Sequence, residues 1–115
     1  MTGPLSLRIG GDPVHLTTAR SFAGSIARVL GLDEGSRHDI RLAVSELVTI
    51  AIRSGQSGVA IVVDLDSETP LLRLEANNTL PSVPRETSEL LSAIDGHIWS
   101  VDEPWVIRLG APVDP

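Results

Sequence analysis

The order and spacing of apolar residues in this 115-residue chain predict an α/β fold, built as an α+β two-layer sandwich. We expect a largely antiparallel mixed sheet with three helices on one face. Three segments carry apolar residues at helical spacing, and five shorter segments have the pattern of strands, most of them joined by short turns. Such strands pair antiparallel, and the three helices need a sheet face on which to bury their apolar sides. A single domain is expected over residues 1–115.

The first strand and helix follow from the N-terminal pattern. Apolar and polar residues alternate over residues 5–9, which indicates a half-buried strand that ends at Gly10 and Gly11. Asp12 followed by Pro13 is typical of a helix start, and Gly31 is typical of a helix end. The residues expected on the buried face of this helix are Leu16, Ala19, Ala23, Ile26, Ala27 and Leu30.

A second helix is predicted from Ser36, which forms a capping-box-like pair with Asp39, to the region of Gly55. Its apolar face is expected to contain Ile40, Val44, Leu47, Val48 and Ala51. The β-branched run Val59–Leu65 and the alternating segment around Leu72 and Leu74 then form a hairpin. Within this run, the strand Val59–Val63 is apolar on both faces, which predicts cover on both sides and hence self-association.

The C-terminal third is predicted as a loop, a short helix and two strands. Asparagines and prolines indicate a loop over Asn77–Pro84. A short helix, ended by Gly96, should place Leu90, Leu91 and Ile94 in the core. The last two strands are expected at His97–Val101 and Trp105–Leu109. Trp99 and Trp105 are expected to pack in the core or on the sheet rather than to anchor a partner.

Composition excludes several classes of function. The chain has no cysteine and a net charge of −6, so thiolate catalysis is excluded and nucleic acid is not an expected partner. No stretch approaches the roughly 20 apolar residues that cross a bilayer, and no secretion signal is recognised. We expect a cytoplasmic protein without membrane association. His15, His38 and His97 lack metal-site spacing, and no metal site is expected.

The second helix carries the pattern most informative about function. Its segment Arg41–Arg53 resembles the N-box helix of GHKL (Bergerat-fold) ATPases, in particular anti-sigma-factor serine kinases. In that family a glutamate is followed four residues later by a magnesium-binding asparagine and then by an alanine. The resemblance implies that Glu46 is a remnant of the catalytic position and that Ala51 matches the alanine. Ile50 stands in place of the asparagine.

The other nucleotide-binding positions that the resemblance implies are also substituted. Ala76 stands at the adenine-recognising aspartate and Asn78 at the first glycine, whereas a register shifted by one residue brings Asn77 to the aspartate position. The segment Arg85–Glu89 should be a glycine-rich phosphate cradle, but it lacks glycine and adds two carboxylates. No bound cofactor is therefore expected, and magnesium-ATP is expected only if the site has been rebuilt.

Two points about these residues stay open from the sequence. Helical angles place Glu46 and Ile50 on one stripe with Asp39 and Ala43, away from the core stripe. Ile50 is also compatible with the core of a helix buried on two sides, and Glu46 with an ordinary solvated position.

Three functions are compatible with the resemblance. The first is a regulatory protein that binds a sigma factor or an anti-sigma-factor antagonist without turning over ATP. The second is an active ATP-dependent serine/threonine kinase with a rebuilt nucleotide site. The third is a structural or dimerisation module. A homodimer is expected because the kinases of the family dimerise.

Overall fold

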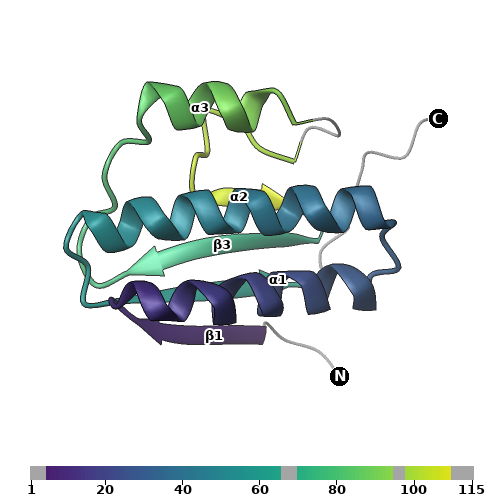
Figure 1. Cartoon of the computed structure of the whole chain (residues 1–115), viewed down its shortest axis with the longest axis horizontal. Coiled ribbons are helices and arrows are strands. Elements are labelled where there is room, and N and C mark those ends of the chain that lie inside the picture. Colours follow the sequence, from purple (N-terminus) through teal and green to yellow (C-terminus); the bar gives the residue numbers. More distant parts are fainter. Residues whose placement is uncertain (1–4, 66–69, 95–97, 110–115) are drawn as a thin grey trace.

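The computed structural model describes residues 5–65, 70–94 and 98–109, and within these ranges the chain forms two layers (Figure 1). One layer is a sheet of four strands in the order β1-β2-β3-β4, with every neighbouring pair antiparallel. The other layer contains the helices α1, α2 and α3. The predicted two-layer fold is confirmed, while the described sheet is antiparallel throughout rather than mixed.

β1 (Leu5–Gly10) leads through a 3-10 turn at Pro13–His15 into α1 (Leu16–Val29). The Asp12 carboxylate caps the 3-10 turn by accepting a hydrogen bond from the Val14 N–H at 2.9 Å. The regular α-helix therefore begins after the predicted proline. Gly31 ends it, with φ of 74°, and the Leu32 N–H donates back to the Ala27 carbonyl at 3.1 Å. This left-handed ending favours glycine.

α2 (Glu34–Arg53) begins two residues before the predicted Ser36. Asp33 is its N-cap, and the Asp33 carboxylate accepts a hydrogen bond from the Ser36 N–H at 2.8 Å. This backbone hydrogen bond, together with one from the Ser36 side chain, lowers the pKa of Asp33 below its ordinary value of 3.8. A carboxylate also interacts favourably with the positive end of the helix dipole.

β2 (Gly58–Asp64) and β3 (Leu71–Ala76) form the predicted hairpin, and β4 (Val106–Arg108) pairs with β3. The expected strand His97–Val101 is wrong in its described part: residues 98 and 99 have no regular structure, and Ser100 forms only an isolated bridge with Glu103. Residue 97 lies outside the described ranges, as does Gly96, the expected end of the third helix.

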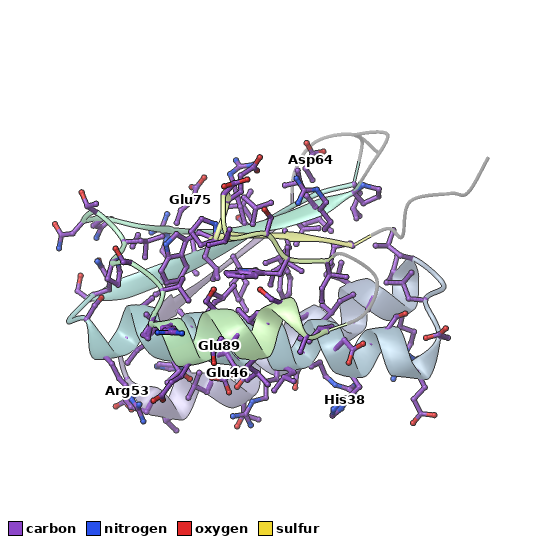
Figure 2. All side chains as sticks on the ribbon, turned by 90° about the horizontal axis from the view of Figure 1, so that it is seen from above. His38, Glu46, Arg53, Asp64, Glu75 and Glu89 are labelled. Carbon is purple, nitrogen blue, oxygen red and sulfur yellow. The ribbon has the colours of Figure 1, made fainter. Side chains whose placement is uncertain are left out.

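The core lies between the sheet and the helices (Figure 2). The core includes every residue predicted for the apolar face of α2. Of the residues predicted for the first helix, Leu16 and Leu30 are only partly buried, at the margin of the core. Ala43, which the helical angles placed away from the core, is fully buried. α1 packs against α2, and Gly24 of α1 lies beside the side chain of Arg41, two residues before Ala43. The close approach of two helices thus widens the buried face of α2.

α3 (Arg85–Ser92) is the shortest helix and packs above α2 (Figure 1). Leu91 is buried and Ile94 packs against the core, as predicted. Leu90 is 42% exposed, so its predicted burial is wrong.

The two tryptophans pack in or against the core, as predicted. Trp99 is buried. Trp105 packs against the core and donates a hydrogen bond from Nε1 to the Pro81 carbonyl at 3.2 Å.

Candidate functional site

The polar face of α2 borders a cavity of about 390 Å³ that opens between this helix and the segment leading into α3. Glu46, Ile50 and Arg53 line it from α2, and Glu86 lines it from the first turn of α3. Figure 2 shows Glu46 and Arg53 on the side of the helical layer that faces away from the sheet. The other lining residues are Thr49, Ser54, Pro81, Ser82, Pro84 and Thr87.

Ile50 lies on the cavity side of α2. It is half-buried and lines the cavity together with Glu46, whereas its neighbour Ala51 is fully buried in the core. Residues four apart share a helix face, which explains why Glu46 and Ile50 border the same space. At this wall of the cavity Ile50 presents an aliphatic surface that offers no ligand to a hard cation.

The nucleotide-site residues predicted at the end of β3 and just after it do not line this cavity. The strand register puts Ala76 opposite Val59, on the helix-facing side of the sheet. Neither Ala76 nor Asn77 nor Asn78 is among the residues that line the cavity on α2. The cavity therefore brings Glu46 and Ile50 together, but its lining does not include the three positions at the end of β3 and just after it.

Gln56 holds the loop that follows β3. Its side chain is buried, its Oε1 accepts a hydrogen bond from the Asn78 N–H at 3.4 Å, and its Nε2 donates to the Thr79 carbonyl at 3.3 Å. A buried amide bonded on both ends fixes the path of this loop relative to the end of α2. Sequence reasoning missed Gln56, because a lone glutamine between two glycines gives no periodic signal.

The start of α3 forms the opposite wall of the cavity. Its N-cap is Pro84, which makes no side-chain capping hydrogen bond, and Glu86 occupies the first turn. A helix N-terminus attracts anions, but the carboxylate of Glu86 already supplies negative charge there. The hydrogen bond from Trp105 to Pro81 ties the preceding loop to the sheet. The cavity therefore has two carboxylates and one guanidinium among its lining residues.

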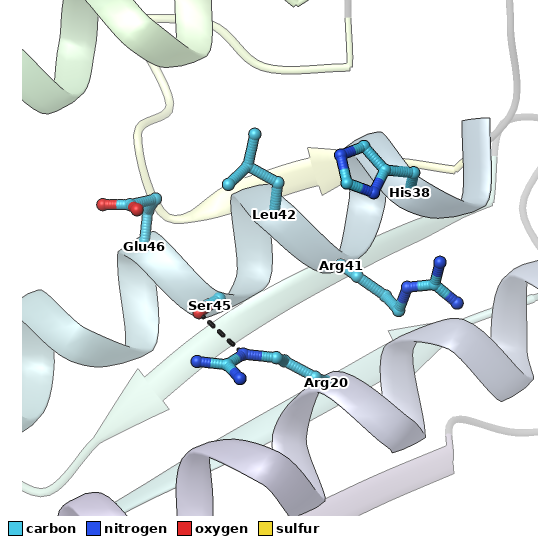
Figure 3. Close-up of a pocket in the computed structure, with 6 residues that line it drawn as sticks. All are labelled: Arg20, His38, Arg41, Leu42, Ser45 and Glu46. Atoms are coloured by element: carbon cyan, nitrogen blue, oxygen red, sulfur yellow. Dashed lines mark hydrogen bonds between the residues drawn. The ribbon is translucent and has the colours of Figure 1, made fainter. Parts of the chain in front are cut away.

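A second cavity of about 370 Å³ lies on the other side of α2, at its seam with α1 (Figure 3). Arg20 of α1 spans the seam, and its Nε donates a hydrogen bond to Ser45 Oγ at 3.0 Å. Figure 3 shows the Arg20 and Arg41 side chains lying along the seam, while Leu42 and Glu46 project away from it. Glu46 lines both cavities, so the two cavities are neighbours on α2.

Sequence reasoning did not group Arg20 with Arg28. Their spacing of eight residues, which keeps them on one side of the helix, was the signal that could have grouped them. Arg41 gave no such signal, because its place beside Arg20 depends on how the two helices pack.

No group of three or more histidine, cysteine, aspartate or glutamate side chains in the described ranges is arranged to hold a metal ion. No described helix combines the length and the apolar character needed to cross a membrane.

Comparison with known proteins identifies the family. No curated protein matches the chain at a significant level. The family model of the histidine kinase-like ATPase domain matches residues 9–90, a span that starts in β1, includes α2 with the cavity beside it, and ends in α3. This match covers well over half of the chain, and it agrees with the two-layer fold and with the resemblance seen in α2. The chain therefore belongs to the histidine kinase-like ATPase domain family.

Proposed function

We propose that this protein is a cytoplasmic regulator of the anti-sigma-factor type, which binds a sigma factor or an anti-sigma-factor antagonist and does not turn over ATP. The observation that carries the proposal is the position of Ile50. It lines the cavity beside Glu46, at the place where the resembled kinases have a magnesium-binding asparagine. A protein of this family with such a cavity is better suited to holding a partner than to transferring phosphate.

The residues around the cavity do not fit magnesium-ATP as the family binds it. Ile50 supplies no oxygen ligand for magnesium. Ala76 supplies no carboxylate for adenine. Glu86 places a negative charge at the start of α3, where the resemblance implies backbone amides around phosphates, and like charges repel. These three differences act on three separate parts of the nucleotide.

Their joint effect is large enough to empty the site. A buried hydrogen bond or charged contact contributes about 1 to 3 kcal/mol. At about 2 kcal/mol for each contact, the loss of all three shifts a micromolar dissociation constant beyond about 10 mM. Glu46 alone does not restore activity, because a general base needs a positioned phosphate to act on.

Calorimetric titration with magnesium-ATP tests the loss of nucleotide binding. We expect no saturable heat at millimolar nucleotide and no phosphate transfer to a sigma-factor antagonist encoded beside the gene. Glu46→Ala should then behave like the wild-type protein in both assays. A micromolar dissociation constant, or a phosphate transfer that Glu46→Ala abolishes, would show that the nucleotide site has been rebuilt and that the protein is a kinase.

Partner binding is tested separately. The purified protein is titrated with any sigma factor and any anti-sigma-factor antagonist found to be encoded next to it, without nucleotide and with magnesium-ATP. We expect binding to one of them that nucleotide does not change. Absence of binding to both, with nucleotide or without it, contradicts the regulatory proposal.

A further inference from the structure

Three arginines line a continuous groove along the seam between α1 and α2, which we name the arginine groove: Arg20, Arg28 and Arg41. Arg20 and Arg41 line the cavity of about 370 Å³ described above, and all three line an adjoining cavity of about 310 Å³. The two cavities meet at Arg20 and Arg41. The groove thus runs along the outer surface of the helical layer.

Within the described residues no ion pair neutralises the arginine groove, and the one carboxylate among the lining residues of its two cavities, that of Glu46, projects away from the seam (Figure 3). The ion pairs found there join Arg73 to Glu75, Arg85 to Glu89 and Arg108 to Glu103, and none of them involves a groove arginine. Arg20 makes one hydrogen bond, from Nε to the neutral Ser45 hydroxyl. Three unpaired cations beside each other are notable on a chain whose net charge is −6.

The shape of the groove suits an elongated ligand rather than a single small anion. Figure 3 shows the guanidinium groups of Arg20 and Arg41 pointing in opposite directions along the seam. Arg20 and Arg28 lie eight residues apart on α1, which corresponds to about 12 Å along a helix. Gly24 lies between them, and a Cβ added there would sit 3.1 Å from Cδ of Arg41. The glycine therefore leaves room for the Arg41 side chain in the groove.

We propose that the arginine groove binds a carboxylate-rich segment of a partner protein, with glutamates or aspartates spread along one side of a helix. This inference rests on the proposed partner-binding function and assigns it a surface. Arginine pairs well with carboxylates through parallel hydrogen bonds. Carboxylates at i, i+4 and i+8 of a helix span the same distance as Arg20 and Arg28. Nucleic acid is disfavoured, because the strong net negative charge of the protein repels a long polyanion.

A defined peptide tests this surface. The probe is a fluorescein-labelled, alanine-based 16-residue helix with glutamates at i, i+4 and i+8, and its binding is followed by anisotropy at low salt. We expect binding that weakens as salt is raised. Arg28→Glu and Arg41→Glu should each weaken it at least about fivefold, since each replaces an attraction with a repulsion. Arg41→Gln, which removes the charge but keeps much of the side chain, should weaken it less.

Arg8→Glu is the matched control. Arg8 is exposed on β1 beside Ala60, on the face of the sheet opposite the helices, so the same change of charge there should alter binding less than twofold. Thermal unfolding of each variant shows whether it is folded. The proposal is overturned if the peptide does not bind, if Arg8→Glu weakens it as much as Arg28→Glu, or if a glutamine version of the peptide binds equally well.

The wild type and the same variants also test two other ligands of the arginine groove, nucleic acid and a second copy of the chain. Tighter binding of a single-stranded oligonucleotide of equal charge would assign the groove to nucleic acid, and self-association that Arg28→Glu abolishes would assign it to a second copy; either result overturns the proposal. If the natural partner binds the wild type and Arg28→Glu equally well, the arginine groove is not its binding surface, while the proposed regulatory function is unaffected. Phosphate transfer in the wild type contradicts the function and leaves the peptide result unaffected.

Discussion

At the scale of single residues, short polar side chains and glycines decide where the helices begin and how closely loops approach. Asp33 displaces Ser36 as the N-cap of α2, because its carboxylate reaches the Ser36 N–H and carries a charge that the helix dipole favours. Gly11 lets the chain after β1 approach the segment just before β2, where the Gly11 N–H donates to the Ser57 carbonyl at 3.0 Å. Substitutions at Asp33 and Gly11 test these two roles.

The cap at Asp33 should contribute stability that depends on pH. The pKa of Asp33 is lowered in the folded protein, mainly by the hydrogen bond from the Ser36 backbone. The folded state therefore favours the charged form, and the contribution is present above the ordinary pKa of 3.8 and lost as pH falls through the lower folded pKa. We expect Asp33→Ala to lower the thermal midpoint at neutral pH.

Asp33→Asn is the control for this prediction, because asparagine caps a helix as well as aspartate but does not titrate. Its thermal midpoint at neutral pH should stay close to that of the wild type. As pH is lowered below about 4, the thermal midpoint of the wild type should fall more than that of Asp33→Asn, because only the aspartate becomes protonated. A constant difference across this window argues against the lowered pKa.

Gly11→Ala should destabilise the fold. An added Cβ would lie 2.2 Å from the carbonyl oxygen of Gln56, and backbone atoms yield less readily than a flexible side chain. We expect a loss of about 1 to 3 kcal/mol, the range for overpacking, measured by urea unfolding. Gly35→Ala provides the comparison, since its Cβ would meet only Asp33 at an ordinary 3.6 Å and alanine favours the helix. Equal stability of Gly11→Ala and wild type would contradict this packing.

At the scale of elements, α3 is the least firmly held helix, because a single buried residue anchors it. Leu91 is 1% exposed, whereas the adjacent Leu90 is 42% exposed. The helix has eight residues and no side-chain hydrogen bond at its N-cap, so it depends on tertiary packing for its stability.

Leu91→Ala should therefore cost about 2 to 5 kcal/mol of unfolding free energy, as for other buried leucines. Leu90→Ala removes the same atoms from an exposed site and should cost less than about 0.5 kcal/mol. Chemical denaturation of both variants measures the difference. Similar losses for the two would mean that α3 is packed through a different face.

Elements with a strong period could be predicted from the sequence, whereas those set by tertiary contacts could not. The stripes of α1 and α2 and the alternation in β1 identified these elements because burial of one face imposes the period directly. Residues 98–101 have β-like composition, but they form no ladder. They are held instead by core packing of Ile98 and Trp99 and by single hydrogen bonds, such as that from the Arg108 N–H to the Ile98 carbonyl. Leu90 and Ala43 were misplaced because neighbouring helices, not spacing alone, decide which face is covered.

The same distinction applies to the candidate site. Glu46 and Ile50 could be paired from the sequence because one helix carries both. The place of Ala76 at the end of β3 depends on the strand register, and the hydrogen bonds of Gln56 to the loop after β3 depend on how that loop folds back. Arg41 and Arg20 are neighbours only through the packing of α1 on α2.

At the scale of the whole molecule, the apolar strand β2 is covered within one subunit. Ala60 and Val62, which face away from the helices, are 4% and 8% exposed. Their cross-strand partners are Arg8 and Glu75 for Ala60, and Ser6 and Arg73 for Val62. Long polar side chains can cover apolar surface, so β2 needs no second subunit for its burial, and the original reason for self-association no longer applies.

We still propose a homodimer, now on the basis of the outer edge of β1, which lies at one end of the sheet. Edge strands leave backbone groups available for pairing with a second copy. Sedimentation velocity over a range of concentrations should show a species twice the monomer mass of 12.2 kDa, and Ser6→Pro on β1 should weaken its formation. A monomer at the highest concentration would contradict the proposal.

The hydrogen bond from Trp105 to Pro81 makes the fluorescence of Trp105 sensitive to changes at the cavity beside Glu46. The chain has two tryptophans and no tyrosine, and Pro81 both accepts that bond and lines the cavity beside Glu46. Any molecule that enters the cavity and shifts Pro81 will change the polarity around the Trp105 indole and hence its emission wavelength. In a Trp99→Phe background the signal comes from Trp105 alone, so fluorescence spectra can screen small molecules for entry without a label or an assumed chemistry.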